Sequence, residues 1–79
     1  MTRVRYFAGA AEATGTESEH LDVSTLADLR LMILERHGSA FERVLGRCSL
    51  LLNGTLTEDP GTALSEGDTV DVLPPFAGG

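Results

Sequence analysis

One well-delimited helix pattern, over residues 26–37, constrains the fold of this 79-residue sequence more than any other feature. Thr25 is placed to cap its N-terminus, with Asp28 three residues later, and Gly38 ends the pattern. The positions that form its apolar stripe are Leu26, Leu29 and Ile33, widened by Met32 and Leu34, while Leu31 falls on the opposite side. A chain this short has one domain and one core, so this helix must cover an apolar face made by the rest of the chain.

The segments on either side of this helix have the residue pattern of strands. Val4 and Tyr6 alternate with Arg3 and Arg5, as on a strand with one charged face. The run Cys48 to Leu52 is apolar on both faces, which favours a central strand. Strands are predicted at residues 2–8, 18–23, 48–52, 55–57 and 69–73, with short helical pieces at 10–14 and 40–45.

Turn residues separate these segments. Gly15 is expected to end the first helical piece in a left-handed conformation, and Asn53-Gly54 is expected to make a tight reversal. Two strands, the main helix and three further strands then follow in order, which predicts an α+β domain with a mixed sheet of four to five strands. Right-handed crossovers would bring the last strand beside the first in the middle of the sheet. We expect a folded domain over residues 1–73 and a flexible tail over residues 74–79.

Charge and composition exclude several classes of protein. The net charge is −6 with a pI near 4.6, and the six basic residues are all arginine, so nucleic-acid binding is not expected and a basic protein partner is favoured. No apolar run is long enough to cross a membrane. Cys48 is the single cysteine, which fits a reducing compartment, and we predict a cytoplasmic protein. The chain has no lysine, so its side chains offer no amine for isopeptide attachment.

Individual chemistry-bearing residues favour structural roles. Cys48 is expected to be buried and inert, and His37 to lie against the negative end of the main helix. His20 and His37 have no further ligands at suitable spacing, so no metal site is predicted. No nucleophile-base set or phosphate loop is present, so catalysis by the chain alone is not expected. The acids expected in solvated turns are Glu58, Asp59, Glu66, Asp68 and Asp71.

The chain ends in Pro74-Pro75-Phe76-Ala77-Gly78-Gly79. Glycine lacks a Cβ and proline fixes φ, so this segment is a thin arm with a stiff base. Six extended residues reach at most ~20 Å. By itself such an end is also what a frayed tail looks like, and the rest of the chain has to distinguish the two.

These features together resemble the MoaD/ThiS family of ubiquitin-like sulfur carriers. The resemblance rests on the element order, the Asn53-Gly54 turn, the segment Leu64-Ser65-Glu66-Gly67-Asp68-Thr69-Val70 and the Pro-Pro to Gly-Gly ending. It covers the whole chain and is closest to the MoaD branch, the small subunit of molybdopterin synthase. It implies the β-grasp fold.

The resemblance also implies a function. In such carriers the residue equivalent to Gly79 is adenylated by a MoeB-like activating enzyme that uses ATP, and is then converted to a thiocarboxylate. The sulfur is given to cyclic pyranopterin monophosphate in the MoaE-like large subunit of molybdopterin synthase, and the carrier itself binds no cofactor. Gly79 would be the reacting residue, and the residues that enter the partner would be Pro74, Pro75, Phe76, Ala77 and Gly78.

Two alternatives stay open at this point. Related carriers supply sulfur for thiamine thiazole, cysteine or tRNA thiolation, and they share the fold and the Gly-Gly ending. A ubiquitin-like module that binds partners through its sheet, without using its tail, would have the same core pattern.

Overall fold

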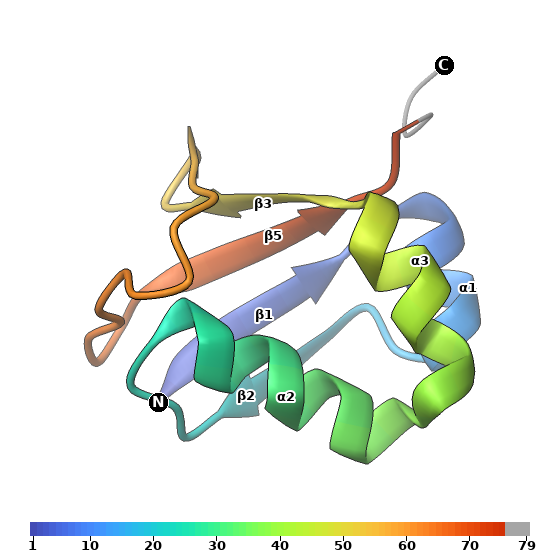
Figure 1. Ribbon diagram of the computed structural model, residues 1–79, viewed down its shortest axis with the longest axis horizontal. Helices are drawn as coiled ribbons and strands as arrows, with labels where there is room; N and C mark the ends of the chain where they lie inside the picture. The colour runs from blue at the N-terminus through green and yellow to red at the C-terminus, as the bar shows by residue number, and fades with distance from the viewer. Residues whose placement is uncertain (76–79) are drawn as a thin grey trace.

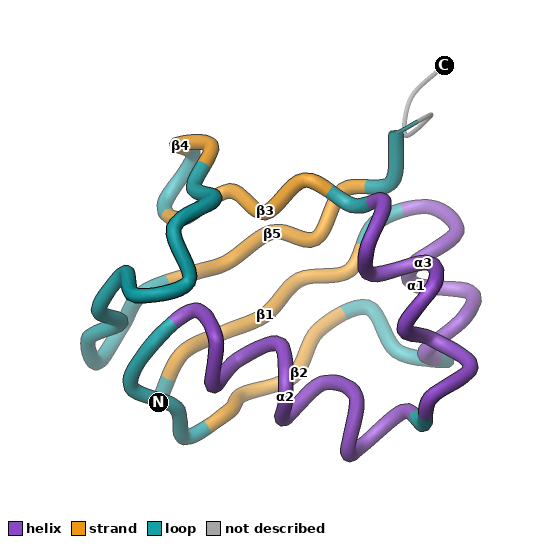
Figure 2. Tube along the Cα trace, viewed as in Figure 1, coloured by secondary structure: helices purple, strands orange, loops and turns teal. Residues whose placement is uncertain are grey.

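The computed structural model describes residues 1–75 and shows a five-stranded mixed sheet with helix α2 across one face (Figures 1 and 2). Helices α1 and α3 lie at the end of the sheet where β1 and β5 finish (Figure 1). The predicted α+β class is confirmed. The elements are β1 (Thr2–Tyr6), α1 (Ala8–Thr14), β2 (Ser18–Leu21), α2 (Leu26–His37), the 3-10 helix η1 (Ser39–Phe41), α3 (Glu42–Arg47), β3 (Ser49–Leu52), β4 (Thr55–Leu56) and β5 (Thr69–Leu73).

The strands lie in the order β2-β1-β5-β3-β4. The last strand, β5, runs parallel to β1 with Val4 opposite Val70, and antiparallel to β3 with Leu50 opposite Val72. The expectation that the last strand lies beside the first in the middle of the sheet is therefore confirmed. β5 is the central strand of the five, with a hydrogen-bonded neighbour on each side.

The segment 48–52, predicted as a central strand, forms β3, an inner strand that lies between β5 and β4. β3 begins at Ser49 and lies next to the short edge strand β4. Of its leucines only Leu50 is buried, at 2% exposure, whereas Leu51 and Leu52 are half-buried. An apolar run indicates that both faces of a strand are apolar. It does not indicate how many further strands lie between that strand and the edge of the sheet.

The core lies between α2 and the facing side of the sheet. The predicted helical stripe is confirmed, since Leu26, Leu29 and Ile33 have no exposed surface and Leu31 is 63% exposed. The predicted N-cap is confirmed as well, because the Thr25 hydroxyl accepts a hydrogen bond of 3.2 Å from the backbone N–H of Asp28. The sheet residues that meet this stripe include Val4, Tyr6, Leu21, Leu50, Val70 and Val72.

The turns explain where the first elements end. β1 stops at Tyr6 rather than at residue 8, because Ala8 has a φ of 48° and starts α1. α1 is longer than the predicted single turn, and Gly15 ends it in the expected left-handed conformation with a φ of 75°. The Asn53-Gly54 reversal is confirmed, with φ values of 49° and 87°. Within residues 1–75 no helix is long and apolar enough to cross a bilayer.

Candidate functional site

Strand β5 leads directly into the C-terminal arm, and its surroundings hold the root of that arm in place. Val70 and Val72 have no exposed surface, and Leu73 is paired with Ser49 of β3. On the other side, the backbone N–H of Phe7 donates a hydrogen bond of 3.2 Å to the carbonyl of Val72. The arm therefore starts from the most strongly held strand of the sheet.

The predicted site residues fall on both sides of the boundary of the described chain. Pro74 is half-buried and Pro75 is exposed, and both lie at the end of β5 where the arm begins. The other predicted site residues, Phe76, Ala77, Gly78 and Gly79, lie outside the described residues, so their roles stay predictions.

The sheet face opposite α2 carries an ion pair that the sequence interpretation missed. Arg5 of β1 binds Asp71 of β5 through two hydrogen bonds, Nε to Oδ1 at 2.6 Å and a terminal nitrogen to Oδ2 at 2.8 Å. The hydrogen bond and charge of Asp71 raise the pKa of Arg5. The Arg5 guanidinium also lies 5.6 Å from the ring centre of Phe7, as in a cation–π contact.

This pair corrects the prediction for Asp71, which was expected in a solvated turn. Its side chain is only 13% exposed, because it lies inside β5 between neighbouring strands. Both residues face away from α2 by strand alternation, and the predicted pairing of first and last strands brings them side by side. The signal that could have found the pair was thus the combination of alternation with the predicted strand order.

Apolar side chains share this open face with the ion pair. In the strand register Leu56 lies opposite Leu51, Leu51 opposite Asp71, and Asp71 opposite Arg5. Leu56 is 56% exposed, and Leu51 is half-buried. Leu73 also projects from this face, beside the root of the arm, because it lies two residues after Asp71. We refer to Leu51, Leu56 and Leu73 as the open-face leucines.

The turn before β5 is also more structured than predicted. The Asp68 carboxylate accepts a hydrogen bond of 2.7 Å from the backbone N–H of Ser65 and one of 3.0 Å from the side-chain amide of Asn53. These two bonds lower the pKa of Asp68. Glu66 in the same turn pairs with the amine of Met1. The start of β5 is therefore fixed by local hydrogen bonds, as its end is fixed by its neighbours.

The predicted burial of Cys48 is confirmed, although the residue follows α3 rather than lying inside a strand. It is 9% exposed, and its thiol donates a hydrogen bond of 3.1 Å to the carbonyl of Val44. Burial raises the pKa of this thiol. His20 is exposed, and among residues 1–75 no group of three His, Cys, Asp or Glu side chains is arranged to hold a metal ion.

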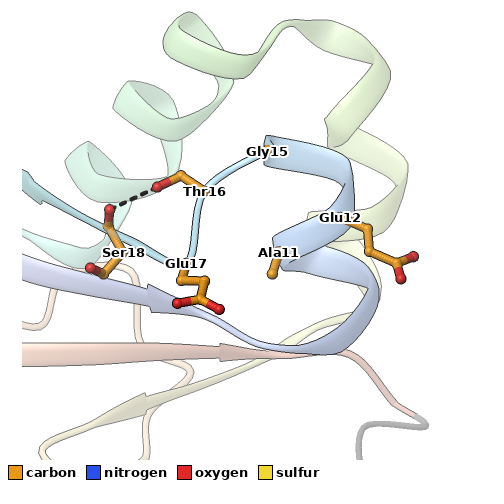
Figure 3. Close-up of a pocket in the computed structure, with 6 residues that line it drawn as sticks. All are labelled: Ala11, Glu12, Gly15, Thr16, Glu17 and Ser18. Atoms are coloured by element: carbon orange, nitrogen blue, oxygen red, sulfur yellow. Dashed lines mark hydrogen bonds between the residues drawn. The ribbon is translucent and has the colours of Figure 1, made fainter.

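A hollow of about 650 Å³ lies between α1 and β2, at the same end of the sheet as the arm (Figure 3). Its two carboxylates, of Glu12 and Glu17, do not converge on a common point (Figure 3). The hydroxyl of Thr16 already has a hydrogen-bond partner, because it donates a hydrogen bond of 3.0 Å to the carbonyl of Ser18. Among the residues that line this hollow, no nucleophilic side chain is hydrogen-bonded to a side-chain base.

The fold and the position of the arm define the class of this protein. A mixed sheet with its main helix on one face, and with the last strand held in the centre beside the first, is the ubiquitin-like β-grasp fold. The chain belongs to the MoaD/ThiS family of ubiquitin-like sulfur carriers, since the model of the ThiS family matches residues 4–79.

Individual relatives agree with this assignment. The chain is 33% identical over 81 residues to the molybdopterin synthase sulfur carrier subunit of Pyrenophora tritici-repentis, with 96% of this chain and 87% of that protein covered. It is similar to a chain in the complex of subunits 1 and 2 of the molybdopterin-converting factor of Helicobacter pylori, with 29% identity, a TM-score of 0.77 and coverage of 99% and 97%. It is also similar to SAMP1 of Haloferax volcanii, with 27% identity, a TM-score of 0.83 and coverage of 99% and 98%.

Proposed function

We propose that the chain is the small subunit of molybdopterin synthase, and that Gly79 carries the sulfur. Its carboxylate is adenylated, converted to a thiocarboxylate, and used to donate sulfur to cyclic pyranopterin monophosphate. The observation that supports this most directly is the buried central strand β5, which continues into Pro74, Pro75 and a Gly-Gly ending in a chain of the MoaD/ThiS family.

The chemistry requires an activated carboxyl group. A carboxylate is a poor electrophile, because its charge is delocalised and its leaving group would be an oxide. A MoeB-like activating enzyme uses ATP to form the acyl-adenylate of Gly79 and releases pyrophosphate. A sulfur nucleophile then attacks the acyl carbon, the bond between that carbon and the phosphate oxygen breaks, and AMP leaves. ATP belongs to this enzyme and not to the carrier.

The geometry of the described residues suits a carrier. The arm has a rigid root at Leu73, and six residues beyond it reach at most ~20 Å, so an active site that receives Gly79 has to come up to the end of β5. Pro74 and Pro75 limit the freedom that the arm loses on entering a partner. Gly78 keeps the arm thin near the reacting group, and Phe76 and Ala77 fill the entrance of the partner's cleft.

Catalysis in this proposal lies in a MoaE-like large subunit. The similarity to one chain of the two-subunit molybdopterin-converting factor of Helicobacter pylori supports a partner of this kind. Leu73 lies beside the arm root, and Leu51 and Leu56 continue the same face toward the β4 edge, so the open-face leucines give such a partner an apolar surface to contact.

The experiment is co-expression of the chain with a MoeB-like enzyme and a sulfur source, followed by mass measurement of the intact protein. We expect one oxygen to be replaced by sulfur at Gly79. The matched controls are a chain lacking Gly78 and Gly79 and a chain with an uncleaved C-terminal tag, and both should stay unmodified. Persistent absence of the sulfur form in the unaltered chain, under conditions where a known carrier is converted, would refute the proposal.

The acceptor pathway is tested separately. The thiocarboxylate form is mixed with the large subunit and cyclic pyranopterin monophosphate, and in parallel with the acceptor systems for thiazole, cysteine and tRNA thiolation. We expect transfer to the pterin. Exclusive transfer to one of the other acceptors would keep the carrier chemistry and replace the pathway. Partner binding that survives removal of Gly78 and Gly79, without any sulfur transfer, would favour the sheet-binding module instead.

A further inference from the structure

The chain is free of side-chain amines, because all six of its basic residues are arginine. This matters because arginine and lysine differ as nucleophiles. The guanidinium group stays protonated in proteins and offers no free lone pair, whereas a lysine amine loses its proton readily and attacks acyl groups.

An activated Gly79 is open to such attack. If an amine of the carrier reached the acyl carbon of the adenylate, a carbon-nitrogen bond would form, AMP would leave with the electron pair of the broken carbon-oxygen bond, and the amine proton would pass to solvent. The arm reaches at most ~20 Å, which is comparable with the extents of the molecule, 29 × 25 × 19 Å. A tethered group also meets its own carrier at an effective concentration of roughly millimolar.

Thiols are the second class of strong nucleophile. The chain has one thiol near the arm root, and this thiol is shielded from solvent. Cys48 directly precedes Ser49, which pairs with Leu73 at the arm root. The thiol is nonetheless buried and hydrogen-bonded to the carbonyl of Val44, and burial keeps it protonated. Ser49, by contrast, is exposed at the same place and carries only a weakly nucleophilic hydroxyl.

The amine of Met1 lies at the other end of the sheet. Because β1 and β5 are parallel, Met1 lies beside the start of β5, where its carbonyl accepts a hydrogen bond of 3.3 Å from the N–H of Gly67 (Figure 1). Its amine pairs with the carboxylate of Glu66. To meet this amine, the arm would have to fold back along the whole of β5, which takes most or all of its reach of ~20 Å.

We infer that the surface within reach of the arm is kept free of lysine amines and exposed thiols, so that the carrier donates its activated carboxyl group and does not capture it. This inference rests on the proposed activation of Gly79. It assigns a role to the all-arginine composition and to the burial of Cys48, and it makes the chain a donor in acyl transfer but not an acceptor.

The test introduces nucleophiles at the arm root without changing charge or fold. Arg47 is the exposed last residue of α3, two residues before Ser49, so Arg47→Lys places an amine there. Ser49→Cys places an exposed thiol opposite Leu73. The matched control is Arg3→Lys, which adds the same amine at an exposed position opposite Thr69, at the start of β5.

Each protein is incubated with the activating enzyme and ATP in the absence of a sulfur donor, and its intact mass is followed. We expect no internal amide in the unaltered chain and only slow formation of one in Arg3→Lys. Arg47→Lys should lose one water and form such an amide, roughly tenfold faster than Arg3→Lys because the amine is held near the arm. Ser49→Cys should form an internal thioester that hydroxylamine cleaves. Equal inertness of Arg47→Lys and the unaltered chain, at equal rates of pyrophosphate release, would overturn the inference.

A second experiment separates this inference from the proposed function. Each protein is prepared by intein cleavage as a C-terminal thioester at Gly79, which is an activated acyl group made without the activating enzyme. Faster loss of this thioester in Arg47→Lys than in the other lysine variant supports the inference even if no enzyme adenylates the chain. Equal rates in all variants contradict it. Absence of pyrophosphate release in every protein would instead count against the proposed function.

Discussion

The carboxylate of Glu19 in β2 and the imidazole of His37 at the end of α2 are joined by a hydrogen bond of 2.6 Å between Oε2 and Nε2. The same carboxylate accepts a hydrogen bond of 2.6 Å from the Tyr6 hydroxyl and one of 3.0 Å from Arg36. His37 therefore pairs with Glu19, a contact that the expectation of a simple helix-end position did not include. This cluster ties the C-terminus of α2 to the edge of the sheet, and burial raises the pKa of Tyr6 so that its hydroxyl stays a donor.

Removing Glu19 should weaken the fold more than removing a neighbouring surface acid. Glu19→Ala leaves the partly buried Tyr6 hydroxyl and His37 ring without their acceptor, and should lower the free energy of unfolding by about 1–3 kcal/mol. Glu19→Gln keeps the shape and should lose less. Glu17 is exposed two residues away, and Glu17→Ala should stay within about 0.5 kcal/mol of the unaltered protein. Urea unfolding measures all three, and equal losses for both alanine variants would contradict this account.

Stability should fall on acidification in a window set by the same carboxylate. Burial alone would raise the pKa of Glu19, but the hydrogen bonds and charge of His37, with the hydrogen bond of Tyr6, outweigh it and lower the pKa below the ordinary value of 4.5. A pKa that is lower in the folded state means that the carboxylate stabilises the fold above the unfolded pKa, and that this contribution is lost as the pH falls through the folded value.

The measurement is urea unfolding of the unaltered protein and of Glu19→Gln, near neutrality and at several pH values below 4.5. The variant should lose less stability across this window. It should retain some pH dependence, because the pKa of Asp68 is also lowered and acts with the same sign. Identical slopes for the two proteins would show that Glu19 does not contribute.

The reversal between β3 and β4 should tolerate only glycine at its second position. Gly54 has a φ of 87°, and an added Cβ would meet no atom within 4 Å, so any penalty is purely conformational. Gly54→Ala should therefore lower the free energy of unfolding by about 1–2 kcal/mol. The control is Gly46→Ala in α3, where the backbone is helical and the Cβ position is equally open, so stability should be unchanged or slightly higher. Thermal unfolding would show whether the two changes have opposite effects.

The arm should be dispensable for folding and required for transfer. Within residues 1–75, every core residue lies between Val4 and Val72, so removal of Gly78 and Gly79 should leave the unfolding midpoint unchanged. The same change should abolish formation of the thiocarboxylate in the co-expression assay. A clear loss of stability in the shortened protein would contradict the assignment of the arm as a separate working part.

Substitutions at two of the open-face leucines, Leu73 and Leu56, can show where a partner contacts this face. Leu73 lies at the arm root and Leu56 lies on the edge strand of the same face. If the partner approaches the arm root, Leu73→Ser should raise the KM of the activating enzyme for the carrier by roughly tenfold, as loss of a central apolar contact does, and Leu56→Ser should have a smaller effect. The two KM values measured side by side decide this, and a larger effect at Leu56 would move the contact to the β4 edge.

Local signals in the sequence predicted the elements well. The helix at 26–37, its Thr25 cap, the Gly15 stop and the Asn53-Gly54 turn all depend on residues within a few positions of one another, and all were confirmed. The position of the last strand was also predicted, because crossover handedness limits the possible strand orders.

The sequence by itself therefore determined the elements and the place of the last strand beside the first in the middle of the sheet. The tertiary structure alone decided which polar groups meet: Asp71 with Arg5, 66 positions apart, and Glu19 with His37, 18 positions apart. It also decided that β3 lies next to the edge of the sheet. The physical reason is that residue periodicity shows which side of a strand or helix is buried, whereas the partner across the core depends on register and packing that only the assembled fold sets.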